Sequence, residues 1–155
     1  MPLTLRPVTP ADCDLVCRQR EDMFRSAGHK EDALAAMAEP YRAWQQGRLE
    51  DGSYFGFIAE EAGQPVGGIG LMEVDFPPHP LHPAKASRGY VLNLFVEPAW
   101  RGQGIATKLM AAAEESFRAR GLSYAMLHAT KQARPMYEQH GWSQTPELGK
   151  PLSLA

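Results

Sequence analysis

A glycine-containing turn in the second half of the chain has the residue types and spacing of an anion-binding site. An apolar, strand-like stretch at 90–96 precedes it and an amphipathic helix pattern follows it; the turn comprises Arg101, Gly102, Gln103, Gly104, Ile105 and Ala106. The first amides of a helix have no carbonyl partner and lie at the positive end of the helix dipole. Glycine lets a ligand approach the backbone without meeting a side chain. We therefore predict a phosphate-binding turn.

Two common phosphate motifs do not fit this turn. A P-loop requires Gly-x-x-x-x-Gly-Lys-Ser/Thr, which the sequence lacks. A dinucleotide fingerprint requires a third glycine where Thr107 stands. It also requires an acidic residue at the end of the next strand, where the chain has Leu127, His128 and Ala129. The glycine pair taken alone also fits a plain tight turn.

A second segment makes the interpretation of this turn more specific. Tyr137 lies 31 residues after Ala106, in the pattern Ala-x-x-x-Tyr-x-x-x-Gly-aromatic that ends at Gly141 and Trp142. The turn fits Gln/Arg-x-x-Gly-x-Gly/Ala and follows a strand ending in Val-x-Pro. Together the two segments resemble the GNAT superfamily of acyl-CoA-dependent N-acyltransferases. The resemblance is specific over 90–142, and the order of elements agrees over nearly the whole chain.

The resemblance implies a site for acetyl-CoA. The amides of residues 101–106 would hold its pyrophosphate, and the main chain of Leu94, Phe95 and Val96 would pair with its pantetheine arm. An amide of this strand would stabilise the oxyanion that forms during acyl transfer. Tyr137 would be the general acid that protonates the leaving thiolate, with helix packing as its alternative role. Many members carry Asn where this chain has Thr130, whose hydroxyl would contact the cofactor in part or cap the helix.

The general base is less sharply marked. An alkyl ammonium has a pKa of about 10.4 and must lose a proton before it attacks. We rank Glu73 first because it stands where a strand leaves the sheet. Asp75 and Glu97 are the other acidic candidates, although Glu97 also suits a solvated or capping role. The histidine candidates are His79, His82 and His128; His128 on a buried strand is more typical of a core residue than of a base.

The resemblance implies that the acceptor binds between the first two helices and a proline-rich loop at 75–89. Phe24, Tyr41, Asp75 and His79 are the predicted substrate-binding residues, because an aromatic wall with acids suits a cationic amine. The alternative for the aromatic residues is packing of the helices on the sheet. His79 and His82 lack an evident third ligand, so we expect no metal.

These residues must be positioned by a mixed sheet with helices around it. Alternation and β-branched or aromatic content predict strands at 3–7, 53–60, 65–74, 90–96 and 124–129, and one or two weak strands at 142–155. Capping signals and apolar spacing predict helices at 9–27, 30–46, 102–120 and 133–140. Pro40 should kink or break the second helix. The expected fold is α/β (α+β), GNAT-like, with six or seven strands flanked by about four helices.

Length and charge restrict the class of protein. The 155 residues suit a single N-acetyltransferase (GNAT-like) domain over 1–155. The net charge of −2, from 16 basic and 18 acidic residues, gives no signal for nucleic acid or for a membrane surface. We expect neither a signal peptide nor a membrane helix. Cys13 and Cys17 are expected to be free thiols, which fits the cytoplasm, and a homodimer is left open.

The function predicted from these features is acetyl transfer from acetyl-CoA to a primary amine of a small molecule or peptide. The amine would attack directly in a ternary complex. The alternative is a non-catalytic acyl-CoA-binding sensor or interaction module, suggested by the uncertain base and by Thr130.

Overall fold

The computed structural model describes residues 2–154, and its five strands form one mixed sheet in the order β1-β2-β3-β4-β5. The first three pairings are antiparallel, and only β4 and β5 run parallel. The strands are β1 (Leu3–Pro7), β2 (Tyr54–Glu61), β3 (Gln64–Asp75), β4 (Ser87–Val96) and β5 (Ala125–Leu127). This mixed sheet confirms the predicted fold class.

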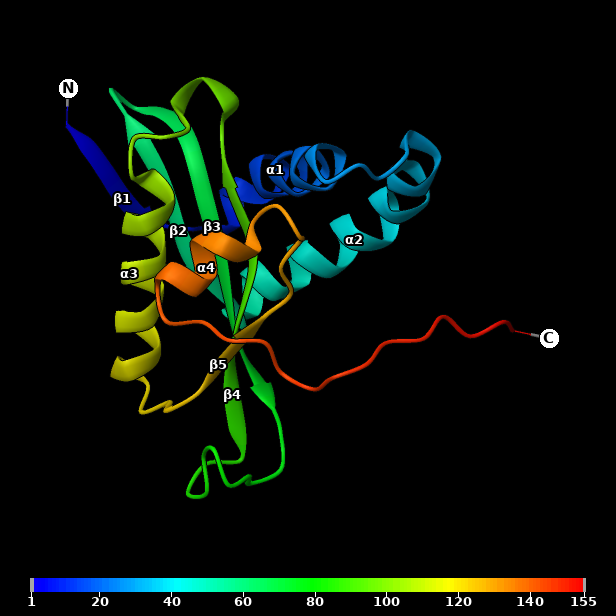
Figure 1. The fold of residues 1–155 in the computed structure, drawn as a ribbon. Helices are drawn as coiled ribbons and strands as arrows, with labels where there is room; N and C mark the ends of the chain where they lie inside the picture. The colour runs from blue at the N-terminus through cyan, green and yellow to red at the C-terminus, as the bar shows by residue number, and fades with distance from the viewer. Residues whose placement is uncertain (1, 155) are drawn as a thin grey trace.

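Helices cover both faces of the sheet (Figure 1). They are α1 (Cys13–Ser26), α2 (Glu31–Asp51), α3 (Ile105–Ala119) and α4 (Arg134–Gln139). Neighbouring residues of β4 show the separation, because Val91 belongs to the core beneath α3 while Leu92 packs against the core beneath α1 and α2. Strand side chains alternate between faces, so each face carries its own apolar cluster.

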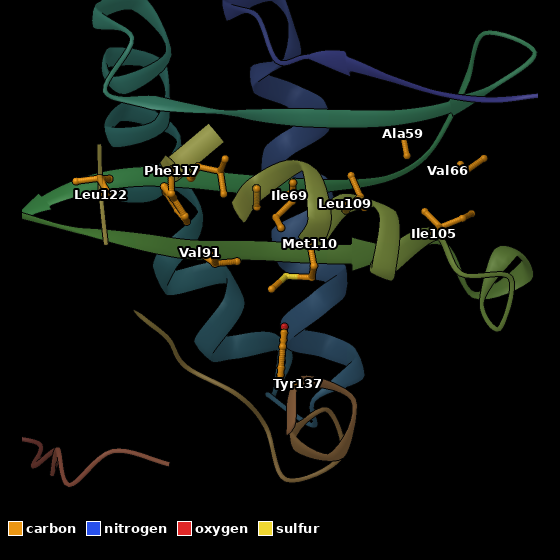
Figure 2. Packing of buried hydrophobic residues seen from close by; sticks show 12 residues of the cluster. Ala59, Val66, Ile69, Val91, Ile105, Leu109, Met110, Phe117, Leu122 and Tyr137 are labelled. Atoms are coloured by element: carbon orange, nitrogen blue, oxygen red, sulfur yellow. The ribbon is translucent and has the colours of Figure 1, made fainter. Parts of the chain in front are cut away.

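The core beneath α3 also contains the residue expected to act as general acid. Leu109, Met110 and Ala113 of α3 are buried against Val91 and Leu71 of the sheet. Figure 2 shows Tyr137 of α4 next to this cluster, with its hydroxyl pointing toward Met110. The amphipathic face of α3 thereby fixes the position of α4.

Two sequence expectations need correction. The structure forms no strand in 142–154, so the sheet has five strands rather than six or seven. Pro146 and Pro151 cannot donate to a ladder, and almost every side chain from 143 to 154 is exposed.

Pro40 does not break α2, which runs through it from Glu31 to Asp51. Pro40 is exposed, so water can reach the carbonyl that its ring leaves unpaired, while Leu34, Tyr41 and Leu49 anchor the flanking turns.

Candidate functional site

The predicted phosphate-binding turn leads directly into α3. Gly104 is the N-cap of α3 with a φ of 81°, and Gly102 has a φ of 79°. A Cβ added at either glycine would meet nothing within 4 Å, so the space above the turn is open. The left-handed backbone favours glycine, and the open space allows an anion to reach the first amides of α3. The turn therefore fits a pyrophosphate.

The Arg101 side chain mainly fixes the turn to the end of β4. Its Nε donates to the carbonyl oxygen of Val96 at 2.9 Å, and its guanidinium lies 5.6 Å from the centre of the Phe95 ring. These contacts tie the turn to the end of β4. The backbone amides, rather than this side chain, are consequently the principal groups for an anion.

The strand before the turn has a free edge. β4 and β5 pair only from Gly89 opposite Ala125 to Val91 opposite Leu127, after which the two strands diverge. The backbone of residues 92–96, which includes Leu94, Phe95 and Val96, therefore has no strand partner on that side. An extended ligand can pair with such an edge as an added strand would.

A β-bulge lies where the strands diverge. Gly68 of β3 is opposite Phe95 and Gly70 is opposite Leu92, so Asn93 and Leu94 together oppose Ile69. Asn93 has a φ of 56°, a conformation that asparagine tolerates better than most residues. A bulge redirects the local peptide groups away from the ladder. An amide is thereby available for the oxygen of a thioester carbonyl.

Tyr137 is 9% exposed, and its hydroxyl points toward Met110 in the core beneath α3 (Figure 2). Burial raises the pKa of Tyr137 to about 12. The phenol is thus held in its protonated form, as a proton donor requires.

Thr130, which was expected to contact the cofactor or to cap the helix, acts as a cap. Its Oγ1 accepts a hydrogen bond from the Ala133 amide at 3.1 Å, just before α4.

A polar network lies behind the bulge, on the face covered by α1 and α2. Asn93 Nδ2 donates to the hydroxyls of Tyr41 at 2.8 Å and Tyr54 at 3.0 Å, and Asn93 Oδ1 accepts from Arg20 Nη1 at 2.7 Å. Tyr54 can lie there because a Cβ on Gly70 would be 2.1 Å from its hydroxyl. Burial raises the pKa of Tyr41 to about 12.

Arg20 brings two of the predicted substrate-binding residues together. Its guanidinium lies 4.7 Å from the ring centre of Phe24 and 4.4 Å from that of Tyr41. Sequence reasoning missed both Arg20 and Asn93. The signal for Asn93 was a single polar residue inside the apolar run 90–96. Arg20 gave no signal, because arginine on an amphipathic helix usually faces water.

The other predicted residues lie away from this network. Glu73 is opposite Gly89, four residues before Asn93 along β4, or roughly 13 Å at strand spacing. Its carboxylate accepts from Ser87 Oγ at 2.8 Å and lies 3.7 Å from Arg120 at the end of α3. Asp75 is exposed and opposite Ser87, roughly 20 Å from Asn93 on the same measure. The structure does not bring either carboxylate to the bulge.

The proline-rich loop is braced by its own side chains. His82 is 1% exposed; its Nε2 accepts from Arg88 Nε at 2.8 Å, and its Nδ1 contacts the Lys85 carbonyl at 3.0 Å. His79 accepts from the Leu81 amide and stacks on His82. Both histidines are therefore engaged in holding the loop. No group of three or more potential metal ligands occurs within residues 2–154.

His128 lies at the divergence point, directly after Leu127. Its Nδ1 is 2.8 Å from the Tyr90 hydroxyl, and its Nε2 is 2.7 Å from Glu147 Oε1. A carboxylate only accepts, so the Nε2–H donates to Glu147 and Nδ1 accepts from Tyr90. His128 is exposed rather than a core residue, and a cavity of about 740 Å³ that Tyr137 also lines lies beside it.

The free edge of β4, the glycine turn and the buried tyrosine lie on one mixed sheet. A sequence profile of the acetyltransferase (GNAT) family matches residues 17–142, and the chain belongs to this family. Members of the GNAT family use acetyl-CoA, so this protein is an acetyltransferase of that class. Within residues 2–154, no helix is both long and apolar enough to span a membrane.

Known proteins resemble the chain over different lengths. A GCN5-related N-acetyltransferase from Ralstonia eutropha JMP134 is 50% identical, with a TM-score of 0.96 over 97% of this chain and 99% of that one. Acetyltransferase Atu2258 from Agrobacterium fabrum is 48% identical over 65 residues, which is 41% of this chain and 47% of that relative. A predicted acetyltransferase from Clostridium acetobutylicum, solved with acetyl-CoA, is 24% identical and shares the fold with a TM-score of 0.88 over 97% of this chain and 96% of that one.

Proposed function

We propose that this acetyltransferase transfers the acetyl group of acetyl-CoA to a primary amine of a small molecule or peptide, by direct attack in a ternary complex. The observation that carries the proposal is the unpaired edge of β4, which runs from the bulge at Asn93 into the open glycine turn. If acetyl-CoA binds along this edge, the bulge would receive its thioester carbonyl and the start of α3 would receive its pyrophosphate.

The residues around the bulge divide the chemistry between them. The amine nitrogen forms a bond with the thioester carbonyl carbon, and a β4 amide near Leu94 stabilises the negative charge on the oxygen. When the carbon–sulfur bond breaks, the Tyr137 hydroxyl gives its proton to the thiolate. The products are an amide and a free thiol, and Tyr137 regains its proton from solvent.

We propose His128, rather than Glu73, as the final proton acceptor. The proton leaving the amine would pass to the Tyr90 oxygen while the Tyr90 hydroxyl proton moves to His128 Nδ1. Glu147 would then stabilise the imidazolium through its contact with Nε2. Glu73 is less suitable because Arg120 and Ser87 already engage its carboxylate.

An acyl-CoA-binding module without turnover is the second candidate. Two positions favour it: Thr130 caps α4, and Glu73 faces Arg120.

The cysteines bear on the cellular location of the protein. Cys13 and Cys17 are buried and free, and burial raises the pKa of the Cys17 thiol to about 11. We propose a reducing cytoplasm for either candidate.

Thiol release tests the proposal. The protein is incubated with acetyl-CoA and a panel of primary amines and peptides, and free CoA thiol is measured against hydrolysis without acceptor. At least one amine should raise thiol release and yield its N-acetyl product by mass spectrometry. Tight acetyl-CoA binding with no acceptor in the whole panel would favour the binding module instead.

A further inference from the structure

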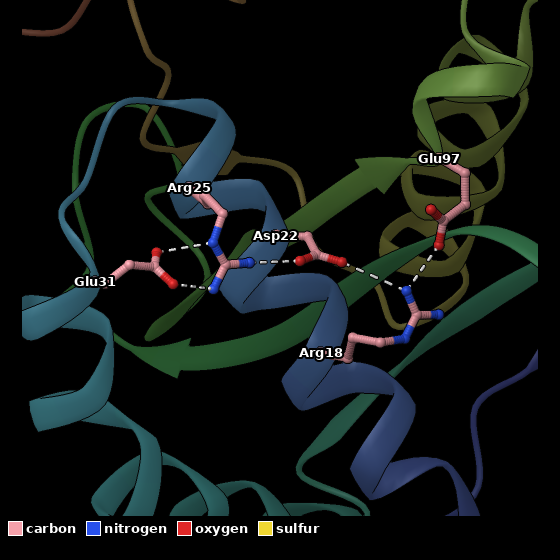
Figure 3. A network of polar contacts seen from close by, with 5 residues as sticks. All are labelled: Arg18, Asp22, Arg25, Glu31 and Glu97. Atoms are coloured by element: carbon pink, nitrogen blue, oxygen red, sulfur yellow. Dashed lines mark hydrogen bonds and ion pairs between the residues drawn. The ribbon is translucent and has the colours of Figure 1, made fainter.

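Arg20 is the one arginine of α1 without a carboxylate partner. Arg18 contacts Asp22 at 3.4 Å and Glu97 at 3.0 Å, and Arg25 contacts Asp22 at 2.7 Å and Glu31 at 2.8 Å. Figure 3 shows these ion pairs as a chain along the outer side of the helix. Within residues 2–154, no acidic group lies within 4 Å of the Arg20 guanidinium.

The guanidinium of Arg20 is also short of hydrogen-bond acceptors. A guanidinium has five N–H donors. The structure shows one bond, from Nη1 to Asn93, and the Nε–H is buried without any partner. The neighbouring Asn93 amide nitrogen supplies no acceptor for the other N–H groups of Arg20, because it donates to the hydroxyls of both Tyr41 and Tyr54. A half-buried charge normally has a counter-charge, so the cluster lacks an anion.

The missing anion has to lie at the acceptor side of the reaction centre. Asn93 is the bulge residue, so the remaining donors of Arg20 are next to the point where the thioester carbonyl would be. The pyrophosphate turn is too distant to supply the charge, because Arg101 is eight residues beyond Asn93. The charge of Arg20 also acts on Tyr90: burial raises the pKa of that tyrosine, and Arg20 opposes the rise.

We propose that Arg20 binds a carboxylate of the acceptor, so that the substrate class is amines carrying a carboxylate close to the amino group. One unpaired guanidinium with parallel N–H groups matches one carboxylate. The rings of Phe24 and Tyr41 both lie within 5 Å of the guanidinium carbon and help to hold its position. This inference rests on the proposed acetylation of an amine, and it replaces the cationic acceptor expected from Asp75.

Matched acceptors test the role of the carboxylate. Free amino acids are compared with their carboxamides, and dipeptides beginning with Asp or Glu with those beginning with Asn or Gln, by thiol release. The wild-type protein should prefer at least one acid over its amide by about 10-fold or more in kcat/KM. Arg20→Gln should remove that preference by raising KM for the acid much more than KM for the amide.

Two further variants separate recognition from folding. Arg20→Lys keeps the charge and should restore part of the preference, whereas Arg25→Gln removes a paired arginine of the same helix and should leave the ratio unchanged. Equal use of acid and amide by the wild-type protein, or an equal loss for both in Arg20→Gln, would overturn the inference alone. Turnover of neither member of any pair would instead count against the proposed function, and the inference would fall with it.

Discussion

Tyr137 combines a polar hydroxyl with an apolar setting. Its ring packs 6.3 Å from that of Trp142 and belongs to the core beneath α3, so the sequence alone could not separate the acid from a packing residue. The packing role is shown by the structure, and the same burial suits the proposed acid role. Burial that fixes the ring also disfavours the phenolate, which is the charged form.

Tyr137→Phe should lower kcat by about 100-fold and leave the Kd of acetyl-CoA unchanged. The ring and its packing remain, and only the transferable proton is lost. Because burial raises the pKa to about 12, the acid stays protonated as pH rises past 10, and activity should not fall there on its account. Steady-state kinetics from pH 7 to about 11 and calorimetry with acetyl-CoA measure both effects. An unchanged kcat would leave Tyr137 with a packing role.

His128→Gln should lower kcat by roughly 10- to 100-fold near neutral pH. Part of the loss should be recovered at higher pH, because more of the amine is then already deprotonated. Tyr90→Phe should give a similar loss, since it interrupts the same path to Nδ1. His79→Gln is the matched control, because His79 contacts its own loop. Full activity of the His128 variant at every pH would exclude the relay.

At the scale of elements, the sequence predicts the helices, strands and turns, because these depend on residues close together along the chain. Periodicity located the strands and helices, and the glycine spacing located the turn before α3. The bulge at Asn93, the divergence of β4 from β5 and the placement of Glu73 depend on register between strands. A single sequence carries little information on register, so the base and the acceptor residues were the least predictable parts of the site.

Gly104→Val should weaken acetyl-CoA binding by at least about 10-fold. The φ of 81° disfavours a β-branched residue, so the turn must change its path and move the first amides of α3. Gly47→Ala in α2 is the control, because a Cβ there meets nothing within 4 Å and alanine is the better helix former. Calorimetry measures the Kd of both variants. Wild-type affinity in Gly104→Val would show that the turn does not hold the cofactor.

At the scale of the whole molecule, the C-terminal segment leaves three leucines exposed. The last part of the chain, up to residue 154, runs away from the body of the protein (Figure 1), and Leu148, Leu152 and Leu154 are 96%, 76% and 95% exposed. β5 is the last strand of the sheet, so its outer edge has no strand partner. Exposed leucines and an open edge in one molecule both favour association with another chain.

We therefore expect a homodimer in which this segment of one copy covers the β5 side of its partner. Light scattering during size exclusion should give about twice the 17.1 kDa chain mass. Replacing the three leucines by serine should shift the mass to one chain, because each copy loses the apolar surface that association would bury. Lys150→Ser, a polar change in the same segment, should leave the dimer intact. A wild-type protein that stays monomeric at every concentration would contradict this expectation.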